Sequence, residues 1–223
     1  MNSTVDNFQP YQARKLDADE TLKAAKDYYT LLDQRRSVRE FSDRAVSMEV
    51  VENIIMAASS APSGAHKQPW TFCVIQDSKI KKAIREAAEK EEYENYHGRM
   101  SEEWLKDLEK FATDWNKPFL ETAPYLIVLF KKAYDFNDDG TKSKNYYVNE
   151  SVGIAAGFLI SAIHHAGLVT LTHTPSPMNF LQKILNRPDN ERAFLLLPIG
   201  YPADNALVPV LSRKPKEDVI VVY

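Results

Sequence analysis

The chain has 223 residues, of which 44% are hydrophobic and 26% are charged, as in a globular protein with one substantial core. The net charge of −3 gives no reason to expect nucleic acid or an anionic membrane as partner. Cys73 is the only cysteine, which excludes an internal disulfide and a thiolate metal cluster. The N-terminus lacks a signal-peptide core, and no apolar run approaches the roughly 20 residues of a membrane span. We therefore expect a soluble, cytoplasmic protein.

The first half of the chain has helical periodicity interrupted by one apolar strand. Residues 19–32 carry apolar side chains at helical spacing, and a second helix is predicted to begin after Ser47, a good N-cap. The apolar run at residues 70–76 predicts a buried strand. Residues 79–115 are charged and favour helix, and Gly98 is expected to break it.

The second half alternates further helices with short apolar runs. Strands are predicted at residues 125–130, 168–172, 193–201 and 219–223, helices at 147–165 and 180–185, and a turn at 137–140. The alternation indicates an α+β or α/β fold.

The motif RRSVRE concentrates positive charge. Arg35, Arg36 and Arg39 stand within five residues of one another, and Ser37 adds a hydroxyl. Guanidinium groups match phosphate oxygens in charge and geometry, so a phosphate clamp is one interpretation, which Arg213 could join. A basic end that complements the dipole of the preceding helix is the alternative.

The segment APSGAHKQPW is a bent loop with small side chains. Ser63, Gly64 and Ala65 lie between two prolines, so a flat ligand could approach the main-chain N–H groups. Taken by itself, the segment favours the alternative, a helix-to-strand connection that needs these residues only to turn. His66 has no second ligand at metal spacing, and we expect no metal site.

The segment LTHTP places hydroxyl groups at the end of a predicted strand. Thr172 and Thr174 flank His173, and their hydroxyls could contact a cofactor or merely satisfy the loop backbone. The chain has no G-x-G-x-x-G, Walker or G-x-S-x-G motif.

The charged stretch EKEEYENYHGR has two possible interpretations. Glu92 and Tyr96 are four residues apart and would be neighbours on one helical face. The stretch could be solvated surface, as we expect for Glu89, Lys90 and Glu91, or it could contribute to a site.

The ordered motifs RRSVREF, APSGAHKQPWTF, ETAPYLIVLF, GLVTLTHTP, LLLPIGYP and SRKP resemble those of the nitroreductase-like flavoprotein superfamily. PSGAH, EEYENY, NKPFLETAP and THTP make the chain similar to its halotyrosine-dehalogenating branch. The resemblance runs from about residue 31 to the C-terminus. It implies an α+β nitroreductase-like fold with a central mixed β-sheet flanked by helices, assembled as an intertwined homodimer with FMN at the interface.

The resemblance also implies a domain organisation. Residues 1–17 would be an N-terminal arm and residues 18–223 a single FMN-binding domain. Residues 89–117 would form a substrate lid, and residues 203–223 would extend onto the partner subunit, where 219–223 would add a strand to its sheet.

Cofactor roles follow from the same resemblance. The phosphate and ribityl end of FMN would be held by Arg35, Arg36, Ser37, Val38 and Arg39, with Arg213 from the other subunit. The flavin would be lined by Ser63 and Gly64 and edged by Thr172, His173 and Thr174. Within this set His173 is expected to act through its main chain, and Thr174 is the catalytic candidate because its hydroxyl would face flavin N5.

The substrate roles are likewise implied by the resemblance. Glu92 would bind the α-ammonium of a halotyrosine, Lys117 its α-carboxylate, and Tyr96 would add a hydrogen bond to the same head group. The main-chain N–H of Ala65 would bind the phenolate.

The activity implied is FMN-dependent reductive dehalogenation of iodo-, bromo- or chlorotyrosine to tyrosine and halide by one-electron steps, with an NAD(P)H-linked reductase as a possible electron donor. One alternative is an NAD(P)H-dependent nitro- or quinone reductase of the same superfamily. Another is a non-catalytic flavin- or phosphate-binding module.

Overall fold

The computed structural model describes residues 8–223 and divides the chain into two compact units, Met1–Arg35 and Arg36–Tyr223. The first unit contains α1 (Ala18–Asp33), which confirms the helix predicted at 19–32. Asp17 and Glu20 form a capping box at its start, so the sequence fixes where this helix begins. Residues 8–17 of the expected arm contain no helix or strand, and residues 1–7 of that arm lie outside the described part.

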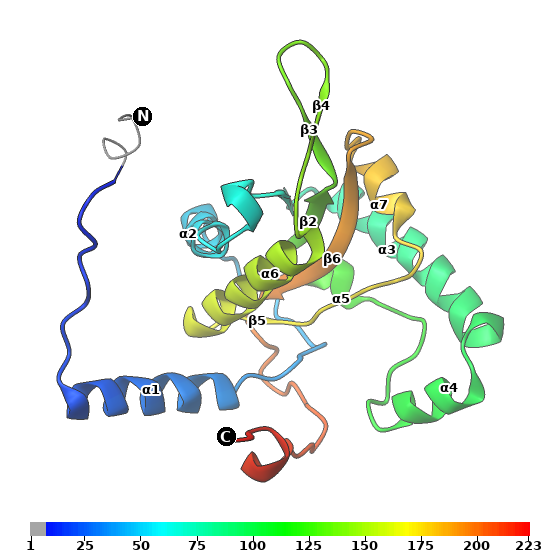
Figure 1. The fold of residues 1–223 in the computed structure, drawn as a ribbon. Coiled ribbons are helices and arrows are strands. Elements are labelled where there is room, and N and C mark those ends of the chain that lie inside the picture. The colour runs from blue at the N-terminus through cyan, green and yellow to red at the C-terminus, as the bar shows by residue number, and fades with distance from the viewer. Residues whose placement is uncertain (1–7) are drawn as a thin grey trace. The chain divides into compact units, whose positions relative to one another are not determined.

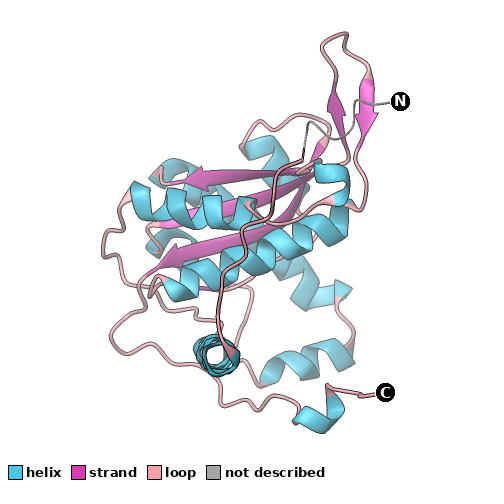
Figure 2. Ribbon diagram, turned by 60° about the vertical axis from the view of Figure 1, so that its left-hand side comes forward, coloured by secondary structure: helices cyan, strands magenta, loops and turns pink. Residues whose placement is uncertain are grey.

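A four-stranded sheet forms the centre of the second unit (Figures 1 and 2). Its strand order is β1-β2-β6-β5, and every named pair is antiparallel. The strands are β1 (Trp70–Ile75), β2 (Tyr125–Lys132), β5 (Val169–Thr170) and β6 (Glu191–Gly200), which confirms four of the predicted runs. The expected mixed sheet is thus antiparallel in its named strands, and an isolated parallel bridge outside them joins Ser37 to Thr170.

Strand β2 is buried on both faces, which is why its sequence is continuously apolar. Leu126 and Val128 face α3 (Ser78–Glu94), α5 (Phe119–Thr122) and α7 (Asn179–Ile184), whereas Tyr125 and Ile127 face α2 (Met48–Ser59) and α6 (Val148–His165). Successive side chains of a strand point to opposite faces, so one strand contributes to two cores. Helices α2, α3, α6 and α7 confirm predicted ones, including the Ser47 N-cap of α2, whereas α5 was not predicted.

The remaining elements are short. Helical geometry ends at Gly98 in the π turn η2 (Asn95–Arg99), as predicted, and α4 (Glu102–Glu109) follows. The hairpin of β3 (Tyr134–Phe136) and β4 (Lys142–Lys144), which projects from the sheet in Figure 1, was not predicted, although its turn was. The other short elements are η1 (Gly64–His66) and η3 (Lys216–Asp218).

The C-terminal segment is apolar. Residues 219–223 belong to no strand of the described chain, and the side chains of Val221, Val222 and Tyr223 are exposed. Their pairing with another sheet stays a prediction. Within residues 8–223, no helix has both the length and the apolar character that crossing a membrane requires.

Candidate functional site

A cavity of about 790 Å³ opens between the end of α3 and the segment that follows β5. Seven of the residues predicted to act on cofactor or substrate line it: Arg39, Glu92, Tyr96, Lys117, Thr172, His173 and Thr174. They come from four separate stretches of sequence. The fold therefore brings together in space motifs that are far apart along the chain.

Backbone pairing brings Arg39 to the LTHTP segment. The N–H of Val38 donates to the carbonyl of Thr170 at 3.2 Å, so the strand-like RRSVRE segment runs beside β5. Beyond β5 the backbone of His173 pairs with Leu196 of β6, through N···O distances of 2.8 and 3.1 Å. Two of the three sequence clusters therefore meet at one sheet edge.

Side chains alternate along the LTHTP segment. The side chains of Thr172 and Thr174 are exposed at the cavity, whereas that of His173 is buried between them. This alternation is what an extended strand imposes. Both threonine side chains are therefore open to the cavity.

A buried charge pair joins the end of α3 to the segment before α5. Lys117 is 4% exposed and Glu92 is 8% exposed, and the Nζ atom of Lys117 lies 4.0 Å from Oε2 of Glu92. Burial raises the pKa of the Glu92 carboxyl, opposed by the Lys117 charge. Burial likewise lowers the pKa of the Lys117 ammonium, with Glu92 opposing. Each group is thus the principal counter-charge of the other inside the cavity.

Tyr96 extends the same wall from the π turn. Its hydroxyl donates to the carbonyl of Thr113 at 3.2 Å, and its ring centroid lies 5.6 Å from the Lys117 Nζ. The turn begins at Asn95, whose carbonyl accepts the N–H of Met100, a five-residue step instead of the helical four. Glu92 and Tyr96 therefore do face one cavity, although not on a continuous α-helix.

His173 has a buried side chain that the sequence interpretation did not use. It is 6% exposed, its ring stacks edge-on against Phe119 at 5.8 Å, and its Nε2 has no hydrogen-bond partner among the described residues. Burial, followed by the charges of Lys117 and Arg39, lowers its pKa to about 3. The imidazole is therefore neutral at physiological pH.

The PSGAH loop lies away from this cavity in the described chain, so Ser63, Gly64 and Ala65 are not brought to the other site residues. Gly64 donates its N–H to Ser151 of α6 at 3.2 Å, and an added Cβ would come within 2.8 Å of the Tyr146 carbonyl oxygen. Ala65 has a left-handed φ of 49°, which a non-glycine residue seldom adopts.

The remaining predicted phosphate contacts also lie outside the cavity lining. The Arg36 guanidinium donates to the Pro209 carbonyl, Ser37 is exposed and Val38 is buried. Arg213 is exposed in the C-terminal segment, and Arg35 belongs to the first unit.

The structure adds lining residues that the sequence did not single out. Trp104 and Leu108 project from α4, and Asn95 donates to the Ser176 carbonyl at 3.0 Å. The four-residue spacing of Trp104 and Leu108 was the available signal. The expectation that Glu89 is surface was wrong: it is 9% exposed, because its carboxylate bonds to Arg85 and to the main chain of Lys117.

The sequence profile of the Nitroreductase family matches residues 32–201. The chain belongs to the nitroreductase family. The α+β nitroreductase-like fold and the resemblance to its dehalogenating branch are confirmed by the relatives that follow.

The chain is 66% identical to the iodotyrosine deiodinase of Haliscomenobacter hydrossis over 216 residues, 97% of each chain. It is 45% identical to human iodotyrosine deiodinase 1, covering 95% of this chain and 74% of the human one. A crystal structure of oxidized iodotyrosine deiodinase bound to FMN and 3-iodo-L-tyrosine matches with a TM-score of 0.73 at 33% identity, over 88% of this chain and 98% of that one.

Proposed function

We propose that this protein is an FMN-dependent oxidoreductase that reductively dehalogenates halotyrosines, with 3-iodotyrosine as a substrate, to give tyrosine and halide. The observation that carries the proposal is the buried pair of Glu92 and Lys117 beside the threonines of the LTHTP segment. The identity to iodotyrosine deiodinases over nearly the whole chain supports it.

The charge pair matches the head group of an amino acid. A free amino acid carries an ammonium and a carboxylate on one carbon, so Glu92 would bind the first and Lys117 the second. Tyr96 lies beside Lys117. Its hydroxyl, which donates to the Thr113 carbonyl, could donate to the same head group instead when substrate binds. Because both charges are buried, each contact would be strengthened by the low local dielectric.

The residues at the cavity fit FMN. The volume of the cavity falls in the range of about 300–1,000 Å³ that cofactor pockets occupy. Arg39 offers a cation, and Thr172 and Thr174 offer exposed hydroxyls, so these three would hold the cofactor. When bound, FMN supplies the two electrons that replace a carbon–halogen bond with a carbon–hydrogen bond. Thr174 would tune this chemistry toward one-electron steps through its hydroxyl.

A second copy of the chain would complete the site. The PSGAH loop, with Ser63, Gly64 and the Ala65 N–H, stands away from the cavity, and so do Arg36 and Arg213. Exposed apolar side chains of α6, Ile154 and Phe158, offer a surface for a homodimer, and the apolar residues 219–223 lack a partner strand in the described chain. We therefore place FMN between subunits, with the PSGAH loop, Arg36, Ser37, Val38 and Arg213 contributing there, together with Arg35.

The electron donor and the cellular location belong to the same proposal. An NAD(P)H-linked reductase would regenerate the reduced flavin, and the enzyme would work in the cytoplasm. A nitro- or quinone reductase that takes hydride from NAD(P)H is the alternative. Two buried opposite charges favour the dehalogenase, since a flat nitroaromatic or quinone has no zwitterion to bind.

The test is an anaerobic single turnover of dithionite-reduced protein with iodo-, bromo- and chlorotyrosine. Each mole of halotyrosine would consume two electrons and one proton and release one mole of tyrosine and one of halide. Absence of tyrosine, together with rapid NAD(P)H-dependent reduction of a nitroaromatic, would favour the alternative.

A further inference from the structure

Glu89 lies one helical turn before Glu92 on the same face of α3. This face, which also buries Lys81, Ile84 and Ala88, packs against the chain that leads from Lys117 into α5. A carboxylate that is only 9% exposed requires specific partners, because burying an unpaired charge is costly.

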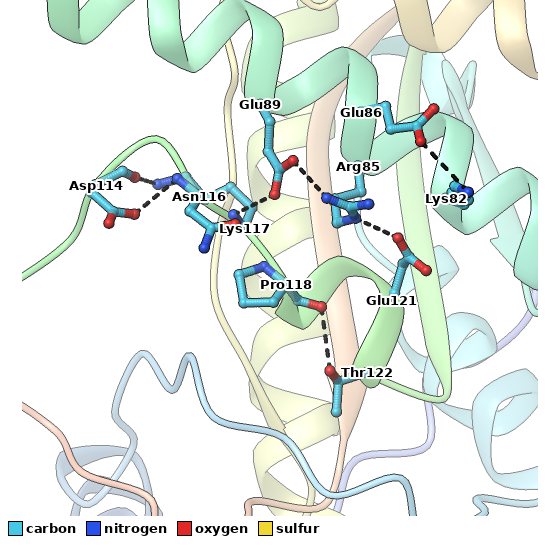
Figure 3. A network of polar contacts seen from close by, with 10 residues as sticks. All are labelled: Lys82, Arg85, Glu86, Glu89, Asp114, Asn116, Lys117, Pro118, Glu121 and Thr122. Carbon is cyan, nitrogen blue, oxygen red and sulfur yellow. Dashed lines mark hydrogen bonds and ion pairs between the residues drawn. The ribbon is translucent and has the colours of Figure 1, made fainter.

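The two oxygens of Glu89 have different partners (Figure 3). Oε1 accepts the main-chain N–H of Lys117 at 2.8 Å. Oε2 pairs with Nη1 of Arg85 at 2.7 Å, and Arg85 in turn bonds through Nε to the carboxylate of Glu121. Glu89 therefore binds the start of the segment at Lys117 directly, and through Arg85 it is also connected to Glu121 near the end of that segment.

The same face of α3 also holds the end of α5. The Nζ atom of Lys81 donates to the carbonyls of Glu121 and Ala123 at 2.9 and 2.8 Å. The segment from Lys117 to Ala123 is thus fastened to α3 at both ends. Its start is held by one side-chain carboxylate.

The position of the Lys117 charge depends on this anchor. Its side chain has four rotatable bonds, and its Nζ also donates to the Asp114 carbonyl and to the Thr113 hydroxyl at 3.3 Å. A fixed backbone at Lys117 limits where this flexible chain can place Nζ relative to Glu92. Glu89 fixes that backbone from a point one turn away from Glu92 on a rigid helix. The spacing of the two charges then depends on α3 through Glu89, together with the Thr113 and Asp114 contacts of Nζ.

We propose that Glu89 is a positioning residue for substrate recognition: by holding the Lys117 N–H, it sets the distance between the Glu92 carboxylate and the Lys117 ammonium and so selects α-amino acids. This inference rests on the proposed function. Glu89 itself touches neither substrate nor cofactor. It acts through Lys117.

The positioning role of Glu89 can be tested by measuring the affinity for 3-iodotyrosine. Quenching of flavin fluorescence in the FMN-loaded protein reports that affinity. Glu89→Ala should weaken binding by roughly tenfold or more, the usual effect of losing a charged hydrogen bond. Glu89→Gln keeps an oxygen acceptor for the Lys117 N–H and should recover most of that loss. Glu86→Ala, which removes the exposed partner of Lys82 on the same helix, is the matched control and should match wild type.

A second probe separates positioning from general damage. 2-Iodophenol carries the halogen and the phenol but neither α-charge, so its turnover by the dithionite-reduced protein should be the same in Glu89→Ala and wild type. An unchanged iodotyrosine affinity in Glu89→Ala, or an equal loss for iodophenol, would overturn the inference. Wild-type protein that binds iodotyrosine without releasing tyrosine would instead overturn the proposed reaction alone.

Discussion

The ammonium of Lys117 and the carboxylate of Glu92 lie 4.0 Å apart on segments 25 residues from one another in sequence, and both are almost wholly buried. Each neutralises the other across a cavity that also presents Arg39 and two threonine hydroxyls. A zwitterion can replace this mutual pairing with one new partner for each charge. A neutral aromatic molecule would leave the pair to itself.

Removing one member of the pair should therefore abolish selectivity for amino acids. Glu92→Gln is expected to weaken 3-iodotyrosine binding by roughly 30-fold or more, since losing one partner of a buried charge pair costs about 2 kcal/mol at the least. FMN content, measured by visible absorbance, should stay at the wild-type level. Glu94→Gln, an exposed change two residues later, is the control. Equal affinities in wild type and Glu92→Gln would remove the zwitterion clamp from the proposal.

The hydroxyl of Thr174 should decide which reaction the protein favours. Thr174→Ala is expected to lower iodotyrosine dehalogenation at least about tenfold while NAD(P)H-dependent reduction of a nitroaromatic is retained or rises, since one hydrogen bond to a charged or polarised group contributes about 1.5–3 kcal/mol. Thr174→Ser keeps the hydroxyl and should preserve the wild-type ratio of the two rates. If Thr174→Ala left that ratio unchanged, the catalytic role of Thr174 would be wrong.

His173 should make the protein sensitive to acid. Its pKa is about 3 in the folded state and about 6.5 when exposed, so the unfolded chain binds more protons between these values. The contribution of neutral His173 to the free energy of unfolding is therefore fully present above pH 6.5 and is lost as the pH falls toward 3. The expected loss between pH 7 and pH 5 from this one group is about 2 kcal/mol.

Denaturant unfolding at pH 7 and pH 5 measures that loss. His173→Thr should reduce the difference between the free energies of unfolding at the two pH values. His165→Asn, a change at an exposed histidine, should leave that difference as in wild type. A wild-type slope in His173→Thr would show that other groups cause the acid sensitivity.

Dimer formation should depend on the exposed apolar face of α6. Phe158→Asp places a charge on that face, so we expect a monomer that loses FMN, because the PSGAH loop of the same chain does not line the cavity. Light scattering after size-exclusion chromatography and the flavin absorbance report both effects. Ile80→Asp, a comparable change on exposed α3 surface, should stay dimeric. A Phe158→Asp dimer with full FMN content would contradict the proposed interface.

The sequence predicted the core elements well because each is specified locally. The continuous apolar run of β2 and the Ser47 cap of α2 need no information from elsewhere in the chain. The β3–β4 hairpin was missed because its strands are only three residues long, too short for a pattern to stand out, and β4 is wholly polar.

The site was less accessible to sequence reasoning. The burial of Glu89 depends on a main-chain N–H 28 residues away, and in sequence it looks like any other glutamate of a charged helix. The loop with Ser63, Gly64 and Ala65 was grouped with Thr174 by resemblance alone, and the single chain does not bring these segments together. Local pattern cannot supply such long-range contacts.

Helix α3 belongs at once to the hydrophobic core and to the wall of the cavity. Ile84 and Ala88 are fully buried beneath the sheet, and Glu89 and Glu92 continue the same face toward the cavity. The acidic half of the proposed substrate-binding pair thus stands on an element that cannot shift without opening the core. A protein engineer seeking new substrates should therefore redesign the turn from Asn95 and α4, and leave the helix before them unaltered.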